Sequence, residues 1–424
     1  MPTEPEIDAP LTLFLVGDLL ITRPWSEEDD PAFLGLLRQL RAADVAIGNL
    51  ETVIHEYRGH AQADSGGTYS AAPPQVARDL AWAGFKLVGH ANNHAFDFGS
   101  TGVLETLAHA RQAGLALAGS GEDLQRARAA ALYRHAKGAV ALVAAAATLV
   151  PYGRASHSRP DFPGRPGVNP LRVEGRPRVD ITRRTAKLLG RLARAAGFSG
   201  RKLALSRFTV GPLEIRVGSS HRVLVRARLD EADLEGNLAA IRGAAASATV
   251  VVVSVHDHPQ GRCLRAFARR AIEAGAKVVL AHGPHEVRGL EIYLGKPIFY
   301  CLGNFVFEPE YVERLPSDFY ERHGLPADAP RQEREPIAAL LASRPETWQG
   351  VGARLRFAAS GLRELTLIPI DLGLGRPAGG RGRPRLADPD LGRRIIERMA
   401  HKSRRFGTEI SYSAVDNAGL VKLG

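Results

Sequence analysis

Short apolar segments of strand type alternate with helix-like patterns along most of this chain, and this alternation constrains its fold more than any other feature. Residues 11–16 form a continuous apolar run, as expected of a strand that is buried on both faces. Residues 249–255 are the most β-like segment, and a helical pattern precedes them at residues 230–246. This alternation predicts an α/β fold with a mostly parallel sheet that carries helices on both faces.

The same patterns predict the remaining elements. Further strands are expected at residues 45–51, 85–88, 115–118, 137–144, 277–281 and 297–302, with a closing antiparallel pair at 351–357 and 362–370. Further helices are expected at residues 31–43, 73–83, 101–113, 180–196, 264–274 and 388–405. Residues 207–229 alternate like a strand pair that turns at residues 218–220.

Length and composition indicate one large core with an insertion. With 424 residues, of which 45% are hydrophobic, the chain can bury a large core. We expect a core over residues 11–310 that includes a basic insertion at 151–230. An irregular segment and the closing strand pair at 311–372 follow. Residues 373–424 are expected to hold a linker with little order at 373–385 and the C-terminal helix.

The lack of a recognisable targeting signal and the two isolated cysteines predict a cytoplasmic location. No run of 18 apolar residues predicts a membrane segment, and the acidic, Pro-containing residues 1–10 do not resemble a signal peptide. Cys263 and Cys301 lie in apolar surroundings, so we expect two reduced thiols.

The positive charge is concentrated in one region. Residues 151–228 contain 18 Lys and Arg against 4 Asp and Glu, a net charge of +14, whereas the rest of the chain is close to −3. Such a block either faces an anionic partner, such as an acidic peptide, a polyanion or nucleic acid, or is a solvated helix face. It lacks interleaved aromatic residues and no standard nucleic-acid module is visible, so we do not expect a nucleic-acid partner.

Several predicted strands end in side chains that can bind a metal. These residues are Asp18, Glu51, Asn93, His94, His256, His282 and His285. A lone histidine at a strand end is usually structural, but several such ends on one parallel sheet would meet at one edge. Carboxylates, an amide and imidazoles without a thiolate suit Mn, Zn, Fe or Ca. A pair of such ions can activate water and stabilise the attacking and leaving oxygens.

The stretch at residues 85–99 shows this pattern most clearly. A short apolar strand runs into a polar turn that holds Asn92, Asn93, His94 and Asp97, and a helical pattern follows. Asn and Asp are also common turn residues, so a turn with capping side chains is the alternative interpretation.

The order of these motifs resembles the calcineurin-like metallophosphoesterase superfamily and, more closely, the CapA family of bacterial capsule and poly-γ-glutamate biosynthesis proteins. The segments that carry the resemblance are 17–18, 48–51, 91–99, 255–256, 282–293 and 297–305. Residues 164–172 also resemble a segment of the long-insertion branch of that family. The resemblance implies a four-layer α/β/β/α metallophosphatase-like sandwich, here with the basic insertion and a C-terminal helical tail.

The resemblance also implies roles for individual residues. One metal site would use Asp18, Glu51 and His285, and the other Glu51, Asn93, His256 and His282. His94 would donate a proton or stabilise developing charge, and Asp97 would orient its ring. The residues expected at the substrate are His90, His258, Arg165 and Asn169.

Three positions depart from the family pattern. Leu20 stands where phosphoesterases usually have a histidine, and Glu51 stands where they have an aspartate. His258 belongs to an Asp-His-Pro sequence where a CapA protein more often has Trp-Gly. The first metal site is therefore expected to be short of ligands and to hold one weak ion or none.

Three functions follow from these observations. The first is a metal-dependent hydrolase or transferase acting on a peptide, polyglutamate-like or phosphoryl substrate. The second is an epimerase acting at an α-carbon of a ribosomal peptide. The third is a non-catalytic scaffold for capsule-polymer assembly, against which the near-complete ligand set argues. In the first two, the basic insertion would suit an anionic substrate such as an acidic peptide or a polyglutamate-like chain.

Overall fold

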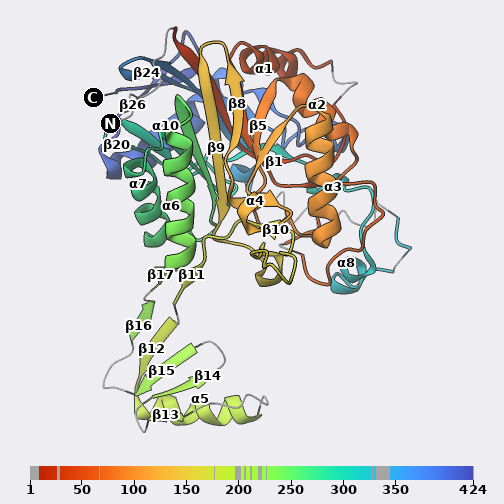
Figure 1. Ribbon diagram of the computed structural model, residues 1–424, viewed down its shortest axis with the longest axis vertical. Helices are drawn as coiled ribbons and strands as arrows, with labels where there is room; N and C mark the ends of the chain where they lie inside the picture. The colour runs from red at the N-terminus through yellow and green to blue at the C-terminus, as the bar shows by residue number, and fades with distance from the viewer. Residues whose placement is uncertain are drawn as a thin grey trace.

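A computed structural model describes residues 9–25, 29–65, 67–175, 177–195, 202–204, 207–210, 213–217, 222–225, 227–326, 328–330 and 344–423. These residues form a mixed α/β fold with two large sheets and a smaller projecting unit (Figure 1). The predicted α/β class is therefore confirmed.

The larger sheet has the strand order β26-β27-β24-β23-β1-β2-β5-β6, with β22 beside β1 and β25 beside β24. Its parallel part consists of β1 (Leu11–Leu20), β2 (Val45–Leu50), β5 (Phe85–Gly89), β6 (Ala116–Ala118) and β22 (Asn304–Phe307). Its antiparallel part consists of β23 (Gln349–Ala358), β24 (Gly361–Asp371), β25 (Arg385–Leu386), β26 (Ile410–Ser413) and β27 (Ala418–Val421). The predicted closing antiparallel pair is confirmed, and β23 joins it to β1.

The second sheet has the order β20-β21-β19-β18-β9-β8. Its strands are β8 (Ala131–His135), β9 (Gly138–Ala146), β18 (Val250–His256), β19 (Val278–His282), β20 (Leu290–Tyr293) and β21 (Lys296–Phe299). β18 runs parallel to both β9 and β19, and His256 lies opposite His282 in the register. Shorter strands elsewhere are β3 (Val53–Ile54), β4 (Ala71–Ala72), β7 (Ser120–Gly121) and β10 (Gly167–Val168).

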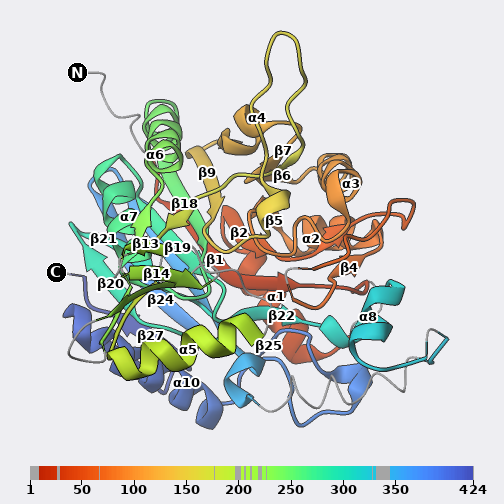
Figure 2. The same cartoon turned by 90° about the horizontal axis from the view of Figure 1, so that it is seen from below.

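The helices lie mainly on the outer faces of the sheets. They are α1 (Pro31–Arg41), α2 (Gln75–Ala83), α3 (Gly99–Gln112), α4 (Leu124–Arg128), α6 (Glu231–Ala245), α7 (Arg262–Glu273), α8 (Ser317–Arg322) and α10 (Pro389–Ser403). Figure 2 shows α6 and α7 on one side of the sheets and α2 and α3 on the other. None of the helices in the described ranges combines the length and the apolar character needed to cross a membrane.

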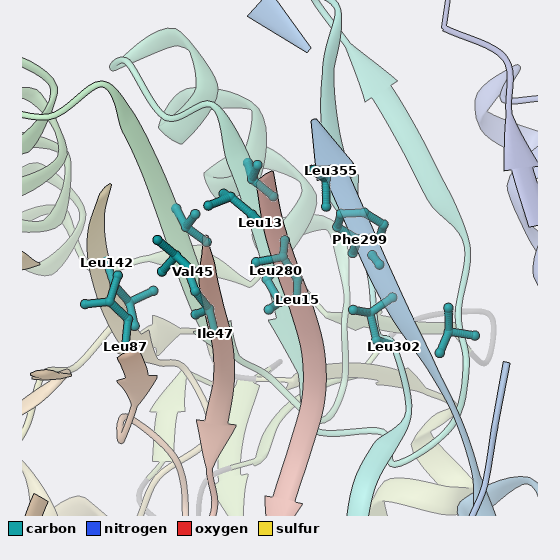
Figure 3. Packing of buried hydrophobic residues seen from close by; sticks show 14 of the residues in the cluster. Leu13, Leu15, Val45, Ile47, Leu87, Leu142, Leu280, Phe299, Leu302 and Leu355 are labelled. Carbon is teal, nitrogen blue, oxygen red and sulfur yellow. The ribbon is translucent and has the colours of Figure 1, made fainter. Parts of the chain in front are cut away.

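Alternation along the strands explains why two sheets form. Leu13 and Leu15 of β1 pack in one cluster with Leu142 and Leu280 of the second sheet (Figure 3). Phe14, between them, packs on the other face in a cluster with residues of α1 and α2. Strand residues alternate between the two faces of a sheet, so one face meets the other sheet and the opposite face meets helices. The prediction of a single sheet with helices on both faces is therefore wrong.

The basic insertion forms a separate small unit that projects from the body in Figure 1. Its sheet has the order β13-β14-β15-β12-β16 and is accompanied by helix α5 (Arg183–Ala195). The strands are β12 (Pro177–Ile181), β13 (Lys202–Ala204), β14 (Arg207–Val210), β15 (Leu213–Val217) and β16 (Arg222–Val225). The pair β11 (Val173–Glu174) and β17 (Arg228–Leu229) connects the unit to the body.

One detail of the insertion differs from the prediction. The predicted turn at 218–220 lies outside the described residues. The strands on either side of it, β15 and β16, do not pair with each other, because β12 lies between them and pairs with both. The predicted strand pairing across that turn is therefore wrong.

The C-terminal region is more ordered than predicted. After α10 the chain forms a hairpin of β26 and β27, and β27 pairs with β24. Within the expected linker, Arg385 is only 2% exposed, and its Nε lies 2.7 Å from Asp30 Oδ2 before helix α1. The predicted C-terminal helix is present as α10, but it does not end the fold, because the hairpin of β26 and β27 follows it. Short polar strands carry too weak a pattern to be recognised.

Candidate metal centre

The carboxyl ends of strands from both large sheets bring four of the predicted ligands together. Asp18 lies near the end of β1 and Glu51 directly follows β2, both in the larger sheet. His256 and His282 are the last residues of β18 and β19 in the second sheet. The site thus lies where two sheets meet, and not along the edge of one sheet as predicted.

The separations between these side chains match those between ligands of a common metal ion. His282 Nδ1 lies 3.0 Å from Asp18 Oδ1. Glu51 Oε1 lies 3.6 Å from His285 Nε2 and 3.7 Å from His256 Nε2. Metal–ligand bonds of about 2.1 Å place neighbouring ligands about 3.0 Å apart in an octahedron and about 3.4 Å apart in a tetrahedron.

Most polar atoms of the cluster lack another partner. Asp18, Glu51, His256 and His282 are fully buried. Asp18 Oδ2, Glu51 Oε1 and both ring nitrogens of His256 and of His282 make no hydrogen bond. A buried polar group without a partner costs about 1–3 kcal/mol, and a cation held among these atoms could serve as their shared partner. Two groups in the described ranges can hold a metal ion: Asp18, Glu51 and His256, and Glu51, His258 and His285.

The charges of the cluster depend strongly on one another. Burial favours the neutral form of Asp18, but the imidazoles of His282 and His285 hold its pKa well below the ordinary value. Burial and the charge of Asp18 raise the pKa of Glu51 well above its ordinary value. Burial alone would lower the pKa of His285, but Glu51 and Asp18 raise it to about 9. Burial lowers the pKa of His256. Protons thus balance the two carboxylates, and a divalent cation can replace those protons.

Asn304 determines which nitrogen of His285 can bind a metal. Asn304 Nδ2 donates a hydrogen bond to the backbone oxygen of Thr347 at 2.8 Å, so its Oδ1 faces His285 Nδ1 at 2.9 Å. Nδ1 must therefore carry the proton, which leaves the lone pair of Nε2 directed toward Glu51. His285 also has a left-handed backbone conformation, with φ of 54°, that is uncommon for a non-glycine residue.

A second asparagine, Asn49, links the two carboxylates. Its Nδ2 lies 2.9 Å from Asp18 Oδ1 and 3.4 Å from Glu51 Oε2, and its Oδ1 accepts from Asn92 Nδ2 at 3.3 Å. Sequence reasoning missed Asn49 and Asn304 as residues that orient ligands. Both lie inside segments that carry the family resemblance, 48–51 and 297–305, which is the signal that would have found them.

His94 and Asp97 lie next to the cluster and contact each other. His94 Nδ1 lies 2.8 Å from Asp97 Oδ2, which also accepts a hydrogen bond from Ser70 N at 2.9 Å. Ser70 Oγ in turn donates to the backbone oxygen of Glu51 at 3.0 Å. A carboxylate that accepts from Nδ1 leaves Nε2 as the nitrogen that can exchange a proton with a substrate.

The remaining predicted residues lie in different surroundings. Asn93 is buried in the loop between β5 and α3. His90 is fully buried, and its Nδ1 lies 2.9 Å from Ser120 Oγ. Asn169 is also buried, and its Nδ2 donates to Ala144 O and Asn237 Oδ1. Arg165 is exposed and donates to Arg154 O. No described contact brings His90, Asn169 or Arg165 to the carboxylates.

A cavity of about 490 Å³ opens beside the cluster and provides room for a substrate. His258 and His285 lie in its wall, together with Arg288 and Arg344. Arg288 forms an ion pair with Glu286 at 2.7 Å. The cavity wall therefore combines two imidazoles with two arginines and with the carboxylates of Glu286 and Glu346.

Comparison with known proteins gives consistent matches. The family model described as "Bacterial capsule synthesis protein PGA_cap" matches residues 12–309. The uncharacterized protein y4sH of Sinorhizobium fredii is 33% identical, and the match covers 97% of this chain and 93% of that protein. The PGA biosynthesis protein CapA of Bacillus subtilis is 24% identical over 74% of this chain and 68% of its own length. A probable polyglutamine synthesis accessory protein of Mycobacterium tuberculosis is 29% identical over 68% of this chain and 60% of its own length.

Proposed function

This chain belongs to the family of bacterial capsule synthesis proteins described by PGA_cap, and within this family we propose that it is a metal-dependent hydrolase or transferase. The observation that supports the proposal is the buried cluster of Asp18, Glu51, His256 and His282. Its members lie at ligand separations, and one oxygen of each carboxylate and both nitrogens of each imidazole have no hydrogen-bond partner. A purely structural cluster would pair these atoms with protein donors and acceptors.

Within this proposal the layers follow the metallophosphatase plan. The inner cluster between the two sheets and the outer clusters against the helices support the four-layer α/β/β/α arrangement. In that arrangement the ligands come from strands of both inner layers, as Asp18 and His256 do here.

Different residues of the chain would bind the metal and transfer the proton. Asp18, Glu51, Asn93, His256, His282 and His285 would hold divalent ions such as Mn, Zn or Fe. A bound ion would act as a Lewis acid on a substrate oxygen and make bound water more acidic. His94, oriented by Asp97, gives the leaving group a proton from Nε2. The cavity beside His285 is open to solvent and would admit the substrate.

The substrate class follows from the relatives and from the charges at the cavity. Two relatives are named for PGA biosynthesis and for polyglutamine synthesis, which supports a peptide or polyglutamate-like chain. The cavity wall carries both signs of charge, since Glu286 pairs with Arg288, and Arg344 is the guanidinium there that could bind a carboxylate or a phosphoryl group of the substrate. We therefore propose cleavage or transfer at an acyl, peptide or phosphoryl bond of such a substrate.

The test begins with metal content. The wild type, Asn93→Ala and His282→Ala are purified and their ions counted by elemental mass spectrometry, with the exposed His157→Ala as a matched control. We expect the wild type and His157→Ala to hold the same number of ions and the other two variants to hold fewer. If all four proteins stay empty after supply of Mn, Zn and Fe, the enzyme proposal fails and a scaffold role replaces it.

The loaded protein is then incubated in D₂O with glutamate oligomers and with phosphoesters. New chain ends or free phosphate, seen by mass spectrometry, support hydrolysis or transfer. Deuterium at an α-carbon without cleavage would contradict the proposal and indicate epimerisation instead.

A further inference from the structure

We propose that His258 is a ligand of a second cation, completing the site at which Leu20 offers no imidazole. The inference rests on the proposed metal dependence and extends it. The sequence predicted a first metal site that is short of ligands. With His258 as a further ligand, the chain would instead have two adjacent cation sites that share Glu51.

His258 is held close to the histidines that already face the cluster. Its ring centroid lies 5.0 Å from that of His256 and 5.6 Å from that of His285. Its backbone N–H donates to Thr148 Oγ1 at 3.0 Å, which anchors the turn after β18.

A glycine allows the two histidine-bearing turns to approach each other. Gly283 has φ of 117°, and a Cβ at this position would lie 2.9 Å from the backbone nitrogen of His258. Any other residue would push the turn that carries His285 away from the turn that carries His258. This close approach is what brings the two imidazoles to one site.

The atoms of His258 are suited to bind a cation. Single ligand atoms of Glu51, His258 and His285 lie within 4.8 Å of one another. His258 Nε2 is buried and has no hydrogen-bond partner. Asn304 Oδ1 accepts from His285 Nδ1, so Nε2 of His285 carries the lone pair that can bind a cation. Two nitrogens and one carboxylate oxygen therefore surround one position.

Glu51 connects this position with the neighbouring one. Its Oε1 lies 3.6 Å from His285 Nε2 and 3.7 Å from His256 Nε2, so one oxygen faces both groups of ligands. Leu20 does not contribute, because it is buried in the hydrophobic cluster that packs against α1 and α2. His258 therefore takes the place of the histidine that β1 lacks.

The test counts ions and measures the distance between them. The full chain is loaded with Mn²⁺, freed of excess metal, and analysed by elemental mass spectrometry and by electron paramagnetic resonance. We expect two Mn²⁺ per wild-type chain with a spin-coupled signal. His258→Ala should hold one uncoupled Mn²⁺, with the dissociation constant of the second ion raised at least about 100-fold. The exposed His157→Ala serves as the matched control and should behave as the wild type.

Two further variants and a folding measurement distinguish the loss of a ligand from misfolding. His282→Ala should also hold one ion, and His258→Ala combined with His282→Ala should hold none, while circular dichroism reports folding of each. Two coupled ions in a folded His258→Ala would overturn the inference. A single ion in the wild type would overturn it as well, but would leave the metal-dependent function standing. No ion in the wild type would overturn both.

Discussion

Asn304 offers a test of how the protein around the cluster controls metal binding. Its Oδ1 accepts from His285 Nδ1 at 2.9 Å, and its Nδ2 donates to Thr347 O at 2.8 Å. Asn304→Ala removes both hydrogen bonds from a fully buried position. The ring of His285 then loses the group that fixes its tautomer and orientation.

The size of the effect follows from these two contacts. Loss of a residue that orients a metal-bound histidine typically weakens binding 10- to 100-fold, or about 1.4–2.7 kcal/mol. The buried oxygen of Thr347 also loses its donor, which lowers the free energy of unfolding by about 1–3 kcal/mol. The two losses have different causes and can be separated by a second substitution.

Asn304→Asp is that matched control. A carboxylate still accepts from His285 Nδ1 but cannot donate to Thr347 O. We expect Asn304→Asp to bind Mn²⁺ at least as tightly as the wild type, although it is destabilised like Asn304→Ala. Competition with a fluorescent chelator gives the affinities, and thermal unfolding in excess chelator gives the stabilities. Wild-type affinity in Asn304→Ala would refute the role of His285 as an oriented ligand.

Three further outcomes are expected. His94→Ala should lower kcat about 10²- to 10⁴-fold while the ions per chain, measured in parallel, stay unchanged; a loss of ions would instead make His94 a ligand. Removal of metal by a chelator should lower the melting temperature, and Mn²⁺ at 100 times its dissociation constant should restore about 2.7 kcal/mol, or about 3 °C for a chain of this length; no shift would contradict metal binding to the native state. Burial favours the neutral form of Asp30, but Arg385 and the amides of Ala32 and Phe33 lower its pKa from 3.8 to about 2. A lowered pKa stabilises the fold above pH 3.8 and loses that effect as the pH falls toward 2, so Asp30→Ala should cost about 1–2 kcal/mol in urea unfolding at pH 7 and less at pH 2. A cost that does not change with pH would show that the charge of Asp30 contributes nothing.

The local elements of the core could be predicted because their patterns are strong. β1, β2, β18 and β19 are buried apolar strands with polar residues at or just beyond their ends. The same pattern could not distinguish one sheet from two, because a strand reads as apolar whether its second face meets a helix or another sheet. The hairpin of β26 and β27 was not predicted, because both strands are short and most of their residues are exposed or half-buried.

The candidate site was predicted in part for a similar reason. Asp18 and His256 were expected to meet since both end strands, and they do so across two sheets. His258 was expected at the substrate, but its position relative to Glu51 depends on the close approach of Gly283, which no local pattern reveals. Asn304 acts through a hydrogen bond to His285 that joins residues 19 positions apart.

The sequence by itself determined the α/β class, the family, and the types of side chain available for a metal, since these depend on local periodicity and on residue chemistry. The tertiary structure alone decided that two sheets supply the ligands. It also decided which nitrogen of His285 faces Glu51 and that ligand atoms of Glu51, His258 and His285 lie within 4.8 Å of one another. These properties depend on distances of a few ångströms between turns, and such distances result from packing of the whole core.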